Sequence, residues 1–221
     1  MELLSLKTPV QIGIILFDHV DVLDFAGPFE VFSLSVFEPE DVSRLLMKDL
    51  PLQEKPFHVT MISNTLDTVT AHNGLQLVPQ LQFKDDHPPY DLVIVPGGPL
   101  KAVRQCLKNR ELLQWIANYA VAGCKIASVC SGALILAEAG LLTGKKATTN
   151  AYALEYLEAR YPDVEVIKDV RFVDEGNILT SAGVSAGLDM ALYLVGQWLG
   201  PEGSQRTADT IEYPYWNTGP A

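Results

Sequence analysis

Short apolar segments recur along this chain, and the stretches between them have the spacing of helices. Residues 10–17 read VQIGIILF, a nearly continuous apolar run typical of a strand covered on both faces, as in a parallel sheet. Similar strands, short and rich in β-branched residues, are expected at 57–62, 91–95, 125–129, 170–173 and 177–180. Helices are expected at 28–36, 100–121, 132–139, 151–160 and 185–199. This alternation predicts an α/β protein with a mostly parallel sheet sandwiched by helices.

The remaining segments are expected at the surface. Asp67–Ala71 and Leu75–Pro79 flank His72-Asn73-Gly74, which predicts a hairpin with a tight Asn-Gly turn. Residues 38–56 are charged and contain prolines, as a surface insertion does. The tail from Gly200 shows little periodicity beyond a helical turn around 206–211. Because no repeat or linker divides the sequence, we expect one domain over 1–221, with a core at about 10–199 and a tail at 200–221.

Charge and cysteine content limit the partners and the compartment. With 16 basic and 27 acidic side chains the net charge is -11, which repels nucleic acids and anionic membranes. The three cysteines have spacings that fit neither a disulfide framework nor a zinc site. The start of the chain lacks the pattern of a signal peptide, and no apolar run reaches the ~20 residues of a membrane span. We therefore expect a cytoplasmic protein that binds neither nucleic acid nor membranes.

The clearest chemical signal is Cys130, which stands between an expected strand and an expected helix. The sequence around it reads KIASVCSGAL, typical of a nucleophile elbow, in which a sharp turn presents one side chain and small neighbours relieve the crowding. The N-terminus of the helix is expected to favour the thiolate form. The alternative is that Cys130 is a buried, inert cysteine. Its position between the strand and the helix favours a reactive cysteine. Cys106 and Cys124 lack such surroundings and are expected to be packing residues.

Two glycines follow another buried strand, in the sequence DLVIVPGGP. Gly97 and Gly98 allow the backbone to turn tightly and to expose N–H groups, as in an oxyanion hole. A simple turn would give the same sequence. The signal gains weight if this strand lies beside the one that ends near Cys130, because ligands collect at the carboxyl ends of parallel strands.

Asp24 lies among apolar residues in the sequence VLDFAGPFEV. Partial desolvation there would raise its pKa and suit it to general acid or base catalysis. A turn or N-cap aspartate ahead of Pro28 is an equally good reading. The four histidines, His19, His58, His72 and His87, show no partner motif, so the sequence indicates no cysteine–histidine pair.

These stretches, taken in order, resemble the ThiJ/PfpI superfamily, whose members share a class I glutamine amidotransferase-like, flavodoxin-type fold. The resemblance covers about Val10 to Trp198. It is carried by VQIGIILF, LDFAGP, VIVPGG, SVCSGALILAEAGLLTGKKATT and GNILTSAGVSAGLDMAL. Within the superfamily the chain is most similar to the isocyanide hydratases and to the amidase-like N-terminal domains of AraC-type regulators. Such regulators carry a further helix-turn-helix domain, for which the 22 residues after Leu199 are too few.

The resemblance also implies roles for individual residues. Cys130 matches the nucleophile and Asp24 the general acid or base. Gly98 and Ser131 match positions that provide backbone N–H groups to the site, and the turn that ends at Val184 matches a wall of the same pocket. No metal or organic cofactor is implied.

Asn150 departs from the family pattern. Many members read TTH-W where this chain has Thr148-Thr149-Asn150-Ala151. An amide cannot take up a proton as imidazole can, so proton transfer assisted by a histidine at this position is absent. The missing aromatic residue at Ala151 suggests a differently shaped pocket.

By resemblance, the expected activity is hydration of an isocyanide to an N-substituted formamide by a homodimer. Attack by Cys130, protonation by Asp24 and hydrolysis of a thioimidate would complete the reaction. The alternatives are a glyoxalase- or deglycase-like enzyme and a non-enzymatic redox or ligand sensor, since an exposed thiolate oxidises easily. The N-terminal region and the aromatic residues at 213–216 could form the dimer contact. Those aromatic residues could instead pack on their own domain.

Overall fold

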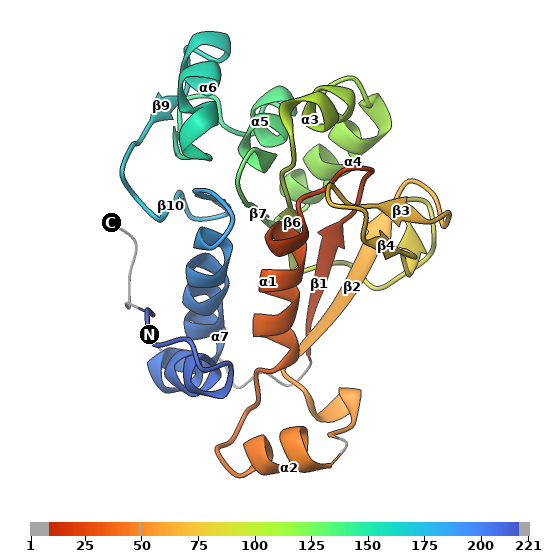
Figure 1. The fold of residues 1–221 in the computed structure, drawn as a ribbon, viewed down its shortest axis with the longest axis vertical. Coiled ribbons are helices and arrows are strands. Elements are labelled where there is room, and N and C mark those ends of the chain that lie inside the picture. The colour runs from red at the N-terminus through yellow and green to blue at the C-terminus, as the bar shows by residue number, and fades with distance from the viewer. Residues whose placement is uncertain (1–8, 49, 217–221) are drawn as a thin grey trace.

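The computed structural model describes residues 9–48 and 50–216, and its centre is a twisted sheet (Figure 1). The strands of this sheet are β1 (Val10–Ile15), β2 (Phe57–Ser63), β5 (Leu81–Gln82), β6 (Leu92–Val95), β7 (Lys125–Ser128), β10 (Phe172–Asp174) and β11 (Ile178–Ser181). Their order is β10-β11-β7-β6-β1-β2-β5. Neighbouring strands are parallel except β10 and β11, which are antiparallel. The predicted mostly parallel sheet is confirmed.

Helices cover both faces of the sheet (Figure 1). On one face, α1 (Val22–Ser33) packs along α7 (Ala186–Thr210) and against β1 and β2. On the other face lie α3 (Leu100–Cys106), α4 (Arg110–Val121) and α5 (Gly132–Glu138). Each layer buries its own apolar cluster against the sheet. This arrangement explains the nearly continuous apolar runs of the strands, because both faces of the sheet are covered.

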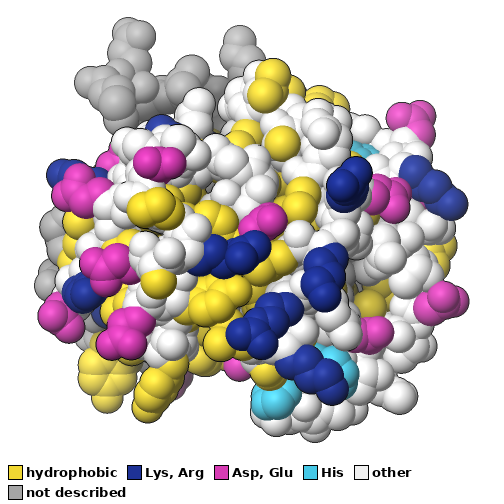
Figure 2. Space-filling view, turned by 90° about the horizontal axis from the view of Figure 1, so that it is seen from above, with side chains coloured by type: hydrophobic (Ala, Val, Ile, Leu, Met, Phe, Trp, Pro, Cys, Tyr) yellow, Lys and Arg dark blue, Asp and Glu magenta, His cyan; other side chains and the backbone are white. Residues whose placement is uncertain are grey.

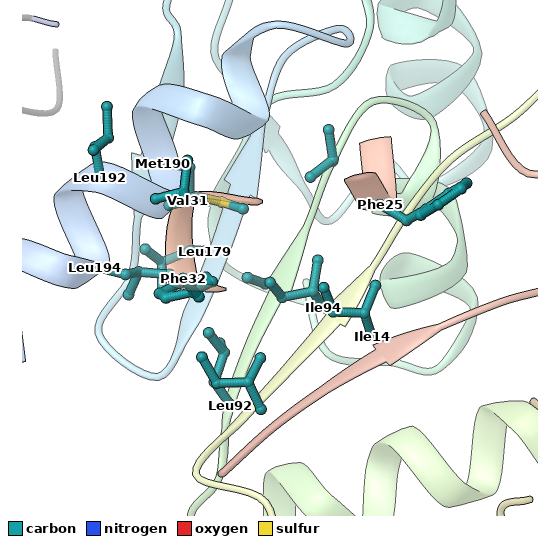
Figure 3. Packing of buried hydrophobic residues seen from close by; sticks show 14 of the residues in the cluster. Ile14, Phe25, Val31, Phe32, Leu92, Ile94, Leu179, Met190, Leu192 and Leu194 are labelled. Carbon is teal, nitrogen blue, oxygen red and sulfur yellow. The ribbon is translucent and has the colours of Figure 1, made fainter. Parts of the chain in front are cut away.

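The packing of α1 determines where the site residues on this helix lie. Phe32 of α1 is fully buried and meets Phe57 edge to face with ring centroids 5.1 Å apart. Figure 3 shows Phe32 beside Leu194 of α7, near strand residues such as Ile94. Burying a side chain of this size contributes about 1.5–3 kcal/mol. The helix is therefore held firmly between the sheet and α7.

The start of α1 corrects the prediction of a helix over 28–36. The helix begins at Val22, and Pro28 lies inside it. Proline is common in the first turn of a helix because the N–H it lacks would have no partner there. Inside α1, Pro28 has no N–H to donate toward the carbonyl of Asp24 one turn earlier. Asp24 thus lies in the first helical turn and not in a preceding loop.

The predicted helix over 100–121 is two helices in the structure. α3 ends at Cys106, and Asn109 caps the N-terminus of α4 by accepting a hydrogen bond from the Leu112 N–H at 3.1 Å. Asparagine is among the preferred N-cap residues because its side-chain oxygen satisfies a free N–H. The continuous apolar periodicity of this stretch concealed the break.

The segment after Gly200 is more helical than predicted: the helical turn expected around 206–211 is the end of a helix that continues to Thr210. Gly200 has φ 76° and ψ 171° and redirects the chain between two helical parts. The second part is fastened to the end of α1: Thr207 Oγ1 lies 3.0 Å from Ser35 Oγ, and Arg206 Nη2 donates to Phe37 O at 2.6 Å. These residues therefore belong to the packed fold and do not form a loose tail.

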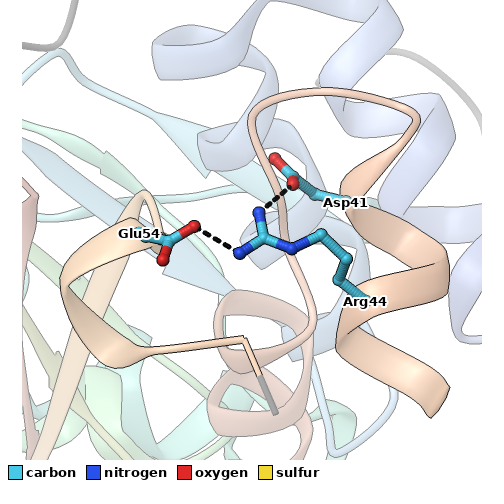
Figure 4. Close-up of polar contacts among 3 residues, drawn as sticks. All are labelled: Asp41, Arg44 and Glu54. Carbon is cyan, nitrogen blue, oxygen red and sulfur yellow. Dashed lines mark hydrogen bonds and ion pairs between the residues drawn. The ribbon is translucent and has the colours of Figure 1, made fainter. Parts of the chain in front are cut away.

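Two surface segments agree with expectation. The predicted hairpin consists of β3 (Val69–Thr70) and β4 (Gln76–Leu77), which pair antiparallel around a turn that includes Gly74 at φ 90°. Residues 38–56 hold α2 (Asp41–Met47) and a 3-10 turn, η1 (Leu52–Glu54). Arg44 joins them, with Nη1 2.8 Å from Asp41 Oδ1 and Nη2 2.6 Å from Glu54 Oε2 (Figure 4). Such exposed ion pairs contribute little to stability.

The last elements lie beside the main sheet. They are β8 (Lys146–Ala147) paired with β9 (Glu165–Val166), the turn η2 (Ala151–Ala153) and α6 (Leu154–Arg160). Within the described part of the chain, no helix has the length and apolar character needed to cross a membrane. The N-terminal region was suggested as a dimer contact, and its first eight residues lie outside the described part of the chain. Residues 217–221 lie outside it as well. Trp216 packs against the core cluster that contains α1 and α7, as the second reading of the aromatic tail expected.

Candidate active site

Cys130 occupies the sharp turn between β7 and α5. Its φ is 58°, in the left-handed region, which costs a residue with a side chain about 1–2 kcal/mol. Two contacts hold this conformation: the Cys130 N–H donates to Ala182 O at 3.0 Å, and Thr149 Oγ1 donates to Cys130 O at 2.7 Å. A Cβ at Gly132 would collide with Val95 O. The geometry is that of the predicted elbow, and the small residue after the turn is a steric requirement.

The two glycines after β6 lie beside Cys130, as adjacent strands would place them. β6 and β7 are parallel neighbours, with Val95 opposite Ser128. A Cβ at Gly97 would lie 2.5 Å from Ser131 Oγ, and one at Gly98 would lie 2.6 Å from His19 O. The close approach of these backbones therefore requires glycine at both positions.

The N–H groups of these glycines have partners, which corrects the expectation that Gly98 donates to the site. Gly97 N–H donates to Asp24 Oδ2 at 3.0 Å. Gly98 N–H donates to Ser131 Oγ at 3.0 Å, and the same hydroxyl donates to Gly98 O at 2.7 Å. The loop is thus locked to the elbow by the Ser131 hydroxyl, which holds both backbone groups of Gly98.

Different N–H groups face the sulfur. The backbone N–H groups of Ser131 and Val184 both lower the pKa of Cys130, so they point toward its thiol. Neither group has a hydrogen-bond acceptor among the oxygen atoms of residues 9–48 and 50–216. Val184 has φ 45°, which is unusual for a β-branched residue. The backbone of Val184 thus adopts a strained conformation beside the sulfur.

Asp24 is fully buried, and burial raises its pKa to about 7. The charge of Asp21 also raises it, whereas the Gly97 N–H and the nearby Cys130 thiol lower it. Its Oδ1 is buried without a hydrogen-bond partner in the described part of the protein. The expectation of a raised pKa is confirmed. The N-cap reading is wrong, because the N-cap position of α1 is occupied by Asp21.

The pKa of Cys130 contradicts the expectation of a low-pKa, exposed thiolate. Burial raises it to about 11, and the charge of Asp24 raises it further, although the N–H groups of Ser131 and Val184 oppose these effects. The cysteine is only 6% exposed, and desolvation outweighs the few N–H groups at the start of a seven-residue helix. Cys106 and Cys124 are also buried, with pKa values raised to about 12, as expected of packing residues.

Asn150 lies where it can act on Cys130. Its Oδ1 accepts a hydrogen bond from the Tyr152 N–H at 3.0 Å, which fixes the direction of the amide. Its Nδ2 lies beside Gly183, where a Cβ would come within 2.6 Å of it. The side chain of Asn150 also lowers the pKa of Cys130. It therefore serves as a neutral donor to the sulfur.

A cavity of about 260 Å³ opens at Cys130. Five of the predicted site residues line this cavity: Gly98, Cys130, Ser131, Asn150 and Val184. Asp24 lies behind the wall, where it interacts with Cys130 and accepts a hydrogen bond from the Gly97 N–H. In Figure 2, which looks down on the end of the molecule where β1 and β2 terminate, apolar side chains are visible between the charged ones. Volume and position suit a small molecule.

Sequence reasoning did not assign six residues that line this cavity: Asp21, His72, Pro99, Leu100, Tyr152 and Ala153. His72 comes from the hairpin turn, and its N–H donates to Val20 O at 2.9 Å. Tyr152 is 96% exposed, at the rim. Asp21 was expected to be a solvated or structural aspartate, because the sequence placed it ahead of the helix expected at 28–36; the structure starts that helix at Val22. No group of three or more metal-binding side chains occurs among the described residues.

The fold and this site define an α/β protein with a cysteine at a nucleophile elbow and a buried carboxyl group beside it. Residues 10–197 match the sequence pattern of the DJ-1/PfpI family, and the chain belongs to that family. An isonitrile hydratase of Pseudomonas putida is 35% identical over 204 residues, which are 92% of this chain and 78% of that protein.

Other similar proteins include a transcriptional regulator and a ThiJ/PfpI family protein with a crystal structure. The HTH-type transcriptional regulator CdhR of Pseudomonas aeruginosa is 35% identical over 51% of this chain, which corresponds to 32% of the regulator. A crystal structure of a ThiJ/PfpI family protein from Pseudomonas syringae superimposes with a TM-score of 0.77 at 27% identity, and covers 96% of this chain and 81% of that one. The family therefore includes proteins with different roles.

Proposed function

We propose that this protein hydrates an isocyanide to an N-substituted formamide, with Cys130 as nucleophile and Asp24 as general acid and base. The observation that carries the proposal is the buried pair of Cys130 and Asp24 at a small cavity. The similarity to an isonitrile hydratase over 92% of the chain supports it. An isocyanide is a small molecule with an electrophilic terminal carbon, which a sulfur nucleophile can attack.

The first half of the reaction uses the one proton that the pair holds at a pH between about 7 and about 11. In the reacting form this proton is on Asp24 and Cys130 is a thiolate. The sulfur forms a bond to the terminal carbon, and Asp24 transfers its proton to the same carbon. The product is a thioimidate, R–N=CH–S, bound to Cys130. The N–H groups of Ser131 and Val184 stabilise the thiolate before attack.

The second half consumes one water molecule. Water adds its oxygen to the thioimidate carbon and one proton to the nitrogen, with the Asp24 carboxylate as the base. The tetrahedral carbon then collapses to a carbonyl, the C–S bond breaks with its electrons on sulfur, and Asp24 receives the hydroxyl proton. N-substituted formamide leaves, and the site returns to its reacting form. The atoms balance without a further reactant.

The alternatives have less support. A redox sensor works through an accessible, acidic thiol, whereas Cys130 is buried and burial raises its pKa to about 11. A glyoxalase-like enzyme is expected to pair its cysteine with a glutamate and a histidine, whereas the groups beside Cys130 are Asp24 and Asn150. A small-molecule substrate, a homodimer and a cytoplasmic location remain predictions.

The test is formamide production from a panel of alkyl and aryl isocyanides, followed by NMR. We expect Cys130→Ala to lower turnover by at least ~10³-fold, because the covalent step is lost. Asp24→Asn should show a similar loss. Cys106→Ala is the matched control, since that thiol is buried beneath the opposite face of the sheet and should leave turnover unchanged. Formamide production by Cys130→Ala at the rate of the unaltered protein would refute the proposal.

A further inference from the structure

The turn at 182–185 joins β11 to α7 and forms part of the wall of the cavity at Cys130. Val184 lies in this turn with φ 45° and lines the cavity. A β-branched residue keeps such a strained conformation only where the surrounding structure holds it. On the side of the elbow, Ala182 O accepts the Cys130 N–H at 3.0 Å. The far end of the turn, at Ser185, has to be held by other groups.

Arg171 contacts both ends of this turn. It directly precedes β10, and its backbone oxygen accepts the Ala182 N–H at 2.9 Å, one step beyond the antiparallel pairs of β10 with β11. Its side chain reaches the other end, where Nη2 donates to Ser185 Oγ at 3.1 Å. Val184 therefore lies between two residues that Arg171 holds.

The guanidinium of Arg171 is itself fixed in direction by Asp189. Nε donates to Asp189 Oδ2 at 2.5 Å, and this carboxylate lies in the first turn of α7. The side chain of Asp189 is buried, whereas that of Arg171 is half-exposed. A guanidinium is planar and its N–H groups keep fixed angles to one another. The bond to Asp189 thus sets the direction in which Nη2 meets Ser185.

The hydroxyl of Ser185 is available for this contact because it does not cap α7. Ser185 occupies the N-cap position, where a serine oxygen ordinarily accepts an N–H from the first turn of its helix. Here the side chain makes no such bond, and its oxygen accepts from Arg171 instead. An ion pair that served only to fasten α7 to β10 would not need this serine.

The conformation of the turn matters to the sulfur through the Val184 N–H. This group donates to no backbone oxygen among residues 9–48 and 50–216, and it is one of two backbone N–H groups that lower the pKa of Cys130. Relaxation of Val184 to a negative φ would rotate the chain about its N–Cα bond and turn the N–H away from the sulfur. The thiolate would then keep only the Ser131 N–H as a backbone donor.

We propose that Arg171 is a positioning residue that holds the 182–185 turn through Ser185 and Asp189, so that the Val184 N–H stays directed at the sulfur of Cys130. The donor stabilises the thiolate before attack and again when the sulfur leaves. The benefit for turnover rests on the proposed function, whereas the position of the N–H does not.

The test measures alkylation of Cys130 by iodoacetamide between pH 7 and 9, with the modified residue identified by mass spectrometry. Arg171→Met removes the guanidinium, and Ser185→Ala removes only its acceptor on the turn and leaves the ion pair with Asp189. Each variant should alkylate about fivefold more slowly, because the thiolate loses a donor. The double variant should be no slower than Arg171→Met, since both changes break the same contact.

The sign of the change separates positioning from a merely structural role. A turn that only loosened would admit the probe more easily and give faster alkylation. Ser185→Ala decides the outcome even where Arg171→Met does not fold, and equal or faster alkylation in this variant would overturn the proposal. Arg44→Met is the matched control, because it removes a half-exposed arginine with two acidic partners on α2, near the amino-terminal ends of β1 and β2 (Figure 1). Its rate should equal that of the unaltered protein.

Turnover of isocyanides gives a second measurement. In Ser185→Ala, kcat should fall about fivefold while KM stays within about twofold, because the donor acts on the sulfur and not on the bound substrate. If the alkylation results hold while no isocyanide is hydrated, the proposed function fails and the role of Arg171 stands. Hydration with unchanged alkylation in Ser185→Ala would keep the proposed function and refute the role of Arg171.

Discussion

Replacing Asp24 with asparagine removes the charge that the site has to bury. The pKa of Asp24 is about 7 in the folded protein, against an ordinary value of 3.8. Each pKa unit corresponds to 1.36 kcal/mol, so the charged carboxylate lowers the free energy of unfolding by ~4 kcal/mol above pH 7. The folded protein binds the proton of Asp24 more tightly than the unfolded chain does. Protonation of Asp24 therefore stabilises the fold fully below about pH 4, and this contribution is lost as the pH rises from about 4 to about 7.

The experiment is urea unfolding of the unaltered protein and of Asp24→Asn at pH 5 and pH 8. The asparagine keeps an acceptor for the Gly97 N–H, but its NH₂ group is new and unpaired, which costs ~1–3 kcal/mol at either pH. This constant cost cancels when the two pH values are compared. Relative to the unaltered protein, the variant should gain ~3 kcal/mol from pH 5 to pH 8. A difference between the two proteins that does not change with pH would refute the electrostatic reasoning.

Two further substitutions test the architecture of the site and of the fold. Gly97→Ala would place a Cβ 2.5 Å from Ser131 Oγ, so formamide production should fall by at least ~10²-fold. Equal activity of the Gly97 variant would contradict the close approach. Asn109→Ala removes the side-chain oxygen that accepts from the Leu112 N–H and should lower the free energy of unfolding, measured in urea, by ~1 kcal/mol. No loss would mean that α4 does not need this cap.

The sheet was predictable because its strands are buried on both faces and leave a clear pattern. Boundaries that depend on single side chains were not. Pro28 favours the start of a helix, yet it lies inside α1, where its ring packs near Gly187 of α7. The position of Pro28 inside the helix thus depends on a contact with a residue that is distant in sequence. Gly200 likewise gives a break in the pattern, and the sequence predicted only a helical turn around 206–211 beyond it, whereas helical structure resumes at Pro201.

The positions of Cys130 and Asp24 and the raised pKa of Asp24 could be predicted from the sequence, but the raised pKa of Cys130 could not. Whether a helix N-terminus outweighs burial depends on how many of its N–H groups reach the sulfur, and of the two N–H groups that do, only that of Ser131 belongs to the start of α5. The partner of the Gly98 N–H was also hidden, since Ser131 is distant from it in sequence and its hydroxyl is turned back onto the loop. His72 lies on a hairpin whose docking on Val20 is a tertiary contact. Local patterns contain none of this information.

The fastening of α1 by Arg206 has a consequence for the order in which the site forms during synthesis. The donor and its acceptor Phe37 O are 169 residues apart in sequence, and a ribosome adds about 5–20 residues per second. The elbow at Cys130 can emerge and pair with its neighbouring strands while one face of α1 is still uncovered. The second part of α7 therefore closes over the end of α1 only after residues near 206 have been made. The elbow also waits for the turn at 182–184, because the Cys130 N–H donates to Ala182 O. The nucleophile and the helix that carries its acid thus both gain their final contacts late in synthesis.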